Sequence, residues 1–228
     1  SFSPAWTPDG KAVTFVGAKA NDQPGFFTKR IDGGGEATRV RARLSNSDME
    51  KWSPDRKWLI FNYFDKDDES DIVGLRPGID TAPVPLVSGH FMEWGADISP
   101  DGRWLAYQSD ETALYQIYVV PFPDTKSRKW VVTASGGIHP KWGPRGDELF
   151  YRDTSGDVFA IPVKTAPSFS AGPPKRLFGA KRAEFPLSPY AITRDDQRVL
   201  MVRLLDPHPI DKVIVVENWL EEVKNKRK

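Results

Sequence analysis

The chain has 228 residues, of which 39% are hydrophobic and 28% are charged, as is ordinary for a water-soluble globular protein. Lys and Arg together number 32 and Asp and Glu number 31, so the net charge is +1, which argues against the basic surface of a nucleic-acid-binding domain. Cysteine is absent and no run of about 18 apolar residues occurs, which excludes disulfides, thiolate metal sites, a cysteine nucleophile and a membrane-spanning helix.

A repeat runs through the whole chain. Five segments align without gaps, and the first residue of each is called its anchor residue below. The segments are WTPDGKAVTFV from Trp6, WSPDRKWLIFN from Trp52, ISPDGRWLAYQ from Ile98, WGPRGDELFYR from Trp142 and ITRDDQRVLMV from Ile192. The anchors are 46, 46, 44 and 50 residues apart, and a spacing in the mid-forties is that of one four-stranded propeller blade.

Each segment predicts a turn followed by the second strand of its unit. In the first unit Pro8 fixes the φ angle of the turn, Asp9 accepts backbone amides and Gly10 permits a positive φ. Apolar residues then alternate with polar ones, as in Val13 and Phe15, which is typical of a strand. The repeated aspartates are therefore interpreted as turn residues and not as catalytic groups.

Further strands follow in chain order. Residues 25–40 predict a third strand, a glycine-rich hairpin and a fourth strand in the first unit. The remaining predicted strands are 116–123 and 157–164 as third strands, 129–135 and 174–179 as fourth strands, and 189–193, 198–204 and 212–219 in the last unit. No helix is expected before 218–228.

We therefore expect an all-β propeller of five blades, at about 1–45, 46–90, 91–136, 137–182 and 183–219, with a charged tail over 220–228. The last blade lacks a predicted fourth strand. Because the chain starts at Ser1 in the middle of a structural unit, we interpret it as a fragment of a larger protein. The incomplete blade would be completed there by upstream sequence or by a sixth blade.

The segments ISPDGRWLAY, QIYVVPFP and GGIHPKWGPRGDELFYR resemble the WD-like repeats of the TolB C-terminal propeller. They also resemble TolB-like sensor domains that follow serine/threonine kinase domains in soil bacteria, as does the ending VIVVENWLEEVKNK. The resemblance implies a propeller, often six-bladed, that contacts proteins or other ligands, and a periplasmic or extracytoplasmic location. Neither the N-terminal domain of TolB nor a kinase signature is found in the chain.

Residues three and four positions before the anchors differ between units, whereas the rest of the repeat is regular. Since first strands converge at the mouth of a propeller channel, this variety indicates a ligand site there. The candidate ligand-binding residues are Asp48, Met49, Trp94 and His139 at these positions, together with the neighbouring Glu50, Glu93 and Tyr190. The alternative is that these side chains only fill or solvate the channel entrance.

No cofactor or catalytic residue is predicted, because G-x-S-x-G, H-E-x-x-H, P-loop and G-x-G-x-x-G motifs are all missing. Asp65, Asp67, Asp68 and Asp71 could ligate Ca²⁺, but the acidic stretch lacks the EF-hand pattern, and a solvated connection is the favoured interpretation. The three histidines occupy unequal repeat positions, so no shared metal site is expected; they are His90, His139 and His208.

These patterns favour a non-enzymatic binding or sensor module for a protein, peptide or small-molecule ligand at the channel mouth, without a nucleic-acid partner or a membrane span. Two alternatives stay open, namely the propeller of a larger prolyl-oligopeptidase-like hydrolase and a sugar-active propeller enzyme. The unpaired edge of the last blade also suggests a homodimer.

Overall fold

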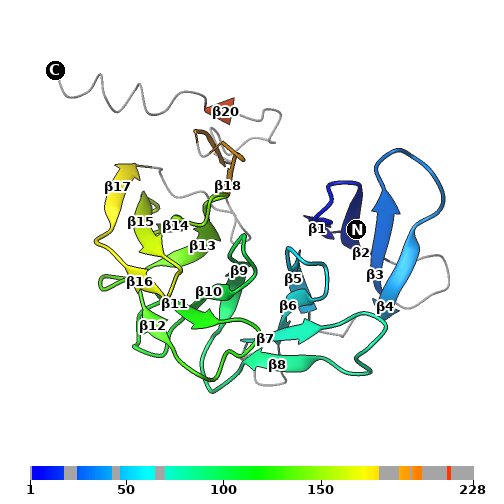
Figure 1. The fold of residues 1–228 in the computed structure, drawn as a ribbon, viewed down its shortest axis with the longest axis horizontal. Helices are drawn as coiled ribbons and strands as arrows, with labels where there is room; N and C mark the ends of the chain where they lie inside the picture. The colour runs from blue at the N-terminus through cyan, green and yellow to red at the C-terminus, as the bar shows by residue number, and fades with distance from the viewer. Residues whose placement is uncertain are drawn as a thin grey trace, which may run out of the picture.

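The computed structural model describes residues 2–17, 25–42, 47–64, 70–179, 190–195, 197–201 and 215–216. In these residues the chain forms strands and no helix (Figure 1). The strands make five antiparallel sheets, and consecutive strands are hydrogen-bonded neighbours throughout every sheet but the fourth. The predicted all-β class is confirmed.

Each of the first four sheets begins with the strand that ends at an anchor residue. The first sheet contains β1 (Phe2–Trp6), β2 (Ala12–Gly17), β3 (Gly25–Arg30) and β4 (Thr38–Ala42). The second contains β5 (Ser47–Trp52), β6 (Leu59–Phe64), β7 (Ser70–Leu75) and β8 (Val84–Val87). The third contains β9 (Trp94–Ile98), β10 (Trp104–Ser109), β11 (Gln116–Pro121) and β12 (Trp130–Val131).

The last two sheets depart from the simple four-stranded pattern. The fourth contains β13 (Ile138–Trp142), β14 (Glu148–Arg152), β15 (Val158–Lys164), β16 (Ser170–Ala171) and β17 (Lys175–Phe178). Both β16 and β17 pair with β15, at opposite ends of it, and β16 was not predicted. The fifth contains β18 (Tyr190–Ile192), β19 (Val199–Met201) and β20 (Val215–Val216), which is three strands in the described part of the chain. The expected tail over 220–228 lies outside the described residues.

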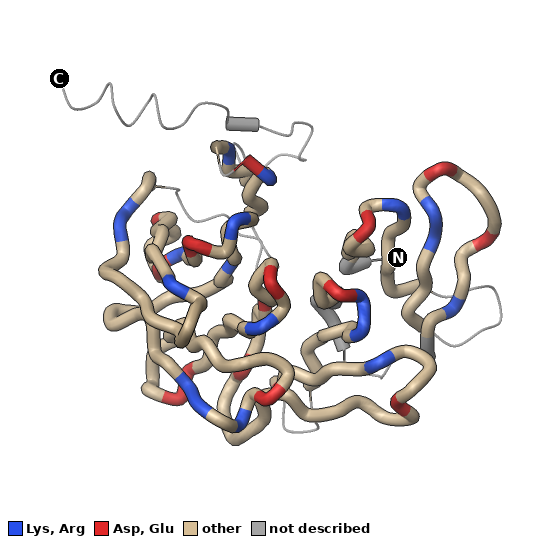
Figure 2. Tube along the Cα trace, in the orientation of Figure 1, with Lys and Arg blue, Asp and Glu red and all other residues tan. Residues whose placement is uncertain are grey.

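The five sheets stand around a common axis, with the first strand of each sheet innermost (Figure 1). This radial arrangement confirms the predicted propeller fragment. Lys and Arg are interspersed with Asp and Glu over all the sheets, so no sheet carries charge of one sign alone (Figure 2).

The turns after the anchors use the predicted chemistry. In the second unit the Ser53 hydroxyl lies 2.6 Å from Asp55 Oδ1, which also accepts the Lys57 amide at 3.1 Å. The same arrangement recurs around Asp9, Asp101 and Asp195. The fourth unit has Gly143 and Arg145 instead, and backbone hydrogen bonds from Gly143 to Glu148 and from Gly146 to Gly143 close its turn.

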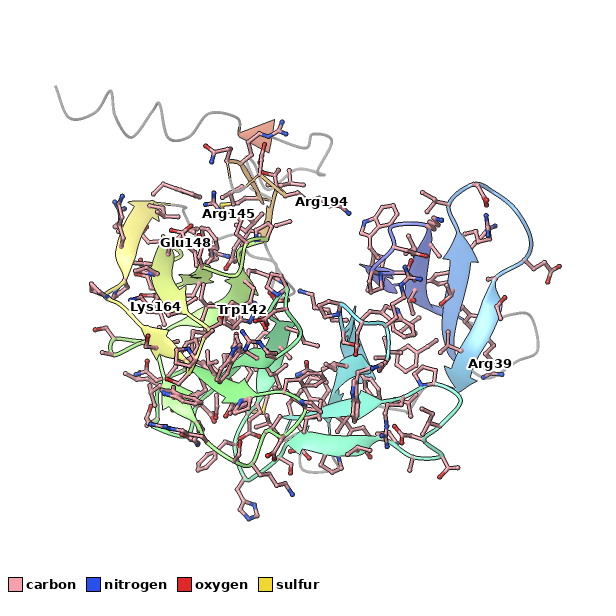
Figure 3. All side chains as sticks on the ribbon, viewed as in Figure 1. Arg39, Trp142, Arg145, Glu148, Lys164 and Arg194 are labelled. Atoms are coloured by element: carbon pink, nitrogen blue, oxygen red, sulfur yellow. The ribbon has the colours of Figure 1, made fainter. Side chains whose placement is uncertain are left out.

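The repeat also explains how neighbouring sheets pack together. Each later anchor residue contacts the sheet that precedes its own. Trp52 packs with Val16 and Phe26 of the first sheet, and its indole N–H donates to Thr14 Oγ1 at 2.7 Å. In the same way Ile98 packs on the second sheet, Trp142 on the third (Figure 3) and Ile192 on the fourth. The core is thus a series of layers between sheets.

Each end of the series leaves a large apolar residue exposed. Trp6, the first anchor, is 62% exposed, and Leu200 on the far face of the fifth sheet is 41% exposed. Described residues of the first and fifth sheets approach each other at a turn, where a Cβ atom at Gly10 would lie 4.0 Å from Arg194 Nη2 (Figure 3). In the described residues, therefore, no sheet covers the anchor face of the first sheet.

Candidate functional site

Three of the predicted site residues come together at the inner strands of the third, fourth and fifth sheets. The rings of Trp94 on β9 and His139 on β13 lie edge to face, with centroids 5.3 Å apart at an angle of 80°. The hydroxyl of Tyr190 on β18 donates to the His139 carbonyl at 2.7 Å. We call Trp94, His139 and Tyr190 the aromatic cluster.

A bulge in the first strand of the unit sets the position of His139. The pairing of β13 with β14 shifts between Ile138 and Lys141, so His139 leaves the regular ladder. Its φ of 55° lies in the left-handed region that favours glycine, and the equivalent residue of the third unit is Gly95, with a φ of 69°. The same shift occurs in the first three sheets, so the bulge belongs to the repeat, and His139 differs from Gly95 in placing a side chain at this left-handed position.

Buried polar groups surround the His139 side chain. Its backbone amide donates to Gln108 Oε1 at 2.7 Å, and Gln108 is fully buried. In the described part of the chain, Gln108 Nε2 and His139 Nδ1 are buried without a hydrogen-bond partner. Buried polar atoms are nearly always hydrogen-bonded, so two such atoms without partners beside His139 are unusual.

The charge state of His139 follows from its surroundings. Burial lowers the pKa of the imidazole to about 4, and the positive charges of Arg152 and Lys141 act in the same direction. Arg152 is itself buried and donates from Nε to the Gly156 carbonyl at 3.3 Å. Near neutral pH the cluster therefore offers an uncharged imidazole beside an indole ring.

Glu93 lies beside Trp94 in the sequence but contacts other elements. Its carbonyl accepts Ser70 Oγ at 3.0 Å and Asn62 Nδ2 at 3.2 Å, which joins the second sheet to the third. Burial raises the pKa of its carboxyl to about 7, and nearby carboxylates, Asp71 first among them, add to the rise. Its Oε2 is buried without a hydrogen-bond partner among the described residues. A ligand-binding role for Glu93 stays a prediction.

The other predicted site residues are only partly placed. Asp48, Met49 and Glu50 lie on β5, where the backbone is described and the side chains are not. In the acidic stretch only Asp71 is described, and its carboxylate accepts the Gly89 amide at 3.4 Å. His90 is exposed, and His208 lies outside the described residues. Within the described ranges no three His, Asp or Glu side chains are grouped to hold a metal ion.

Sequence reasoning missed a charged group on the same strands. Lys51, Asp97 and Lys141 each stand one position before an anchor residue, on β5, β9 and β13. Lys51 Nζ contacts Asp97 Oδ1, and the Trp142 amide donates to Asp97 Oδ2 at 2.7 Å. A charged residue at one repeat position in three successive units was the available signal.

No protein-family model matches the chain. An uncharacterized protein of Agrobacterium fabrum is 30% identical over 130 residues, which are 56% of this chain and 43% of that protein. The chain thus spans less than half of the length of this curated relative. Among the described residues, no helix has the length and apolar character needed to cross a membrane.

Solved structures resemble the chain more extensively. The structure assigned as TolB from Agrobacterium tumefaciens has a TM-score of 0.61 at 23% identity, over 78% of this chain and 65% of that one. TolB from Acinetobacter baumannii has a TM-score of 0.57 at 19% identity, over 88% and 50% of the two chains.

Enzyme structures resemble the chain as well. A periplasmic gluconolactonase from Pseudomonas aeruginosa has a TM-score of 0.56 at 15% identity, over 87% of this chain and 64% of the other. A puromycin-hydrolyzing peptidase from Mycobacterium tuberculosis has a TM-score of 0.58 at 14% identity, over 87% and 34%. Likeness at these identities concerns architecture and leaves activity open. Radial sheets, WD-like repeats and the two TolB structures agree that this chain has the fold of a TolB-like β-propeller.

Proposed function

We propose that this propeller is a non-enzymatic binding or sensor module that holds a protein, peptide or small-molecule ligand against the aromatic cluster. One observation carries the proposal, namely that Trp94, His139 and Tyr190 from three sheets meet beside buried polar atoms that lack partners in the described residues. Flat rings with neighbouring hydrogen-bonding groups are suited to hold a ligand in one orientation.

The surroundings of His139 favour binding over catalysis. A nucleophile and its base need a hydrogen bond between them, and Nδ1 of the imidazole has no partner in the described part of the chain. The Tyr190 hydroxyl already donates to the His139 backbone carbonyl. The pKa of that hydroxyl is raised, with burial as the first cause, so it stays protonated.

A peptide display selection tests the proposal. We expect the intact chain to enrich related peptides, and Trp94→Ala to bind them at least tenfold more weakly. Ile79→Ala is the matched control, because Ile79 is a large apolar residue that is 70% exposed in a turn after β7. Failure to enrich any sequence family, or equal binding by Trp94→Ala, would contradict the proposal.

The proposal includes an extracytoplasmic location and a homodimer formed through the unpaired end of the blade series. Trp6 and Leu200 are the exposed apolar residues at the two ends. Light scattering at increasing concentration is expected to show a dimer that Trp6→Ser weakens. A monomer at every concentration would rule out the dimer without affecting the ligand site.

A further inference from the structure

The charged residues before the anchors form a second group on the innermost strands. Lys51, Asp97 and Lys141 occupy the same repeat position on β5, β9 and β13, and these three strands are neighbours around the axis (Figure 1). In the first and fifth units the position holds Ala5 and Ala191. The charged side chains are therefore confined to one side of the axis.

The single carboxylate of this group contacts one lysine and one backbone amide. The Asp97 side chain is 5% exposed, and it contacts Lys51 Nζ through Oδ1 and the Trp142 amide through Oδ2. Lys141, by contrast, has no hydrogen bond or ion pair within the described residues. Of the two lysines, only Lys51 thus has a carboxylate partner among the described residues.

The two lysines interact through their charges. Burial lowers the pKa of Lys141 to about 8. Burial also lowers the pKa of Lys51, and the positive charge of Lys141 adds to that effect. A partly desolvated cation without a counter-ion among the described residues, as Lys141 is, is unfavourable, so an added anion would be bound and would stabilise the group.

We propose that Lys51 and Lys141 bind a carboxylate group of the ligand. The inference rests on the proposed binding function and specifies its ligand. With both lysines protonated and Asp97 ionised, the three side chains carry a net charge of +1. A carboxylate, which is a monoanion, neutralises this charge, whereas a phosphate dianion would leave a net negative charge. Lysine ammonium groups supply several N–H donors for such a contact.

The aromatic cluster adjoins this carboxylate site along one strand. Lys141 follows His139 by two residues on β13, and its charge reaches the imidazole. A ligand lying against Trp94 and His139 would therefore carry its carboxylate toward Lys141. Such a carboxylate is an acidic side chain, a peptide C-terminus or part of a small organic acid.

Lysine-resolved NMR of the whole chain, labelled with ¹³C and ¹⁵N in lysine, tests the inference. The probes are acetate, succinate, inorganic phosphate, N-acetyl-Gly-Asp-Trp-Gly-amide, its Asn counterpart, and N-acetyl-Gly-Asn-Trp-Gly with a free C-terminus. We expect the Asp peptide or the free-carboxylate peptide to shift the Lys51 and Lys141 signals and to raise the pKa of Lys141. The probe that shifts these lysine signals identifies whether the carboxylate belongs to a side chain, a C-terminus or a small organic acid.

Variants separate binding from a structural effect. Lys141→Met is expected to weaken the active probe about tenfold or more, since a hydrogen bond to a charged group is lost, and Lys141→Arg to retain it. Lys164→Met is the matched control, because Lys164 is an exposed lysine on β15, away from the axis (Figure 3). Measurements on the wild-type chain keep the test valid if a variant fails to fold.

The outcomes distinguish the two proposals. Two results together would overturn the carboxylate site. The Asp and Asn peptide amides would bind equally, and neither the peptide with a free C-terminus nor acetate or succinate would shift the Lys51 or Lys141 signals. Peptides enriched by display and lost in Trp94→Ala would then still support the binding function. Tight binding of phosphate alone would also overturn the inference, because it contradicts the charge argument.

Discussion

The left-handed backbone at His139 predicts an inverted ranking of alanine and glycine. At ordinary strand positions glycine is less stable than alanine by about 0.5 to 1 kcal/mol, because it loses more conformational freedom on folding. In the left-handed region a Cβ atom costs about 1 to 2 kcal/mol, which reverses the order. His139→Gly is therefore expected to be more stable than His139→Ala by about 0.5 to 1 kcal/mol.

The contacts of His139 make this comparison a clean one. Both hydrogen bonds at the residue use its backbone, from the amide to Gln108 and from Tyr190 to the carbonyl, so both variants retain them. Both variants also lose the imidazole and its contact with Trp94. The difference between them therefore reports the backbone conformation.

Urea unfolding followed by tryptophan fluorescence measures the difference. With a typical dependence of about 2 kcal/mol per molar urea, the midpoint of His139→Gly is expected to lie roughly 0.3 to 0.5 M higher. Val131, a 55% exposed residue on β12, supplies the control, where alanine should be more stable than glycine. An alanine variant at position 139 that equals or exceeds the glycine variant would refute the reasoning.

Three further changes test the packing and electrostatics. Tyr190→Phe removes the hydroxyl that binds the His139 carbonyl and should lower the free energy of unfolding by about 1 kcal/mol, which urea unfolding measures; no change would mean that the bond is absent. Leu149→Ala leaves a cavity at a fully buried position and should lower the free energy of unfolding by about 2 to 5 kcal/mol. The control Val131→Ala, at an exposed position, should lower it by less than about 1 kcal/mol, and similar losses in the two variants would contradict the inter-sheet core. Folding raises the pKa of Glu93 to about 7, so its protonated form stabilises the fold below the ordinary value of 4.5, and this contribution is lost as pH rises to about 7. Relative to the wild type, Glu93→Gln should therefore gain stability between about pH 4.5 and 7, and a constant difference in thermal unfolding across that range would contradict the raised pKa.

The repeat determined the fold because its signals are local. A proline, an aspartate and a glycine within a few residues specify a turn, as at Asp101, and the alternation after it specifies a strand. The short β16 was missed because two exposed residues, Ser170 and Ala171, give no apolar alternation. Residue identity alone did not show that β15 offers both of its ends for pairing.

The candidate site was predictable only in part. Irregular positions before the anchors pointed to Trp94, His139 and Tyr190, and the structure brings these three together. Gln108 was not identified, because its side chain contacts the His139 amide only after two sheets have packed against each other. Contacts between sheets depend on the radial arrangement, which a linear pattern does not encode.

The hydroxyl-to-aspartate corners described above have a consequence for how the molecule assembles. Each corner joins residues no more than five positions apart, such as Ser53, Asp55 and Trp58. It can therefore form before any contact between distant parts of the chain. The fourth corner, around Gly143, has main-chain hydrogen bonds but no hydroxyl-to-aspartate bond, because Gly143 has no side chain. Hairpins should therefore nucleate first in the units that have the hydroxyl-to-aspartate hydrogen bond. During folding, the backbone amides of the fourth hairpin should become protected from hydrogen exchange later than those of the other hairpins.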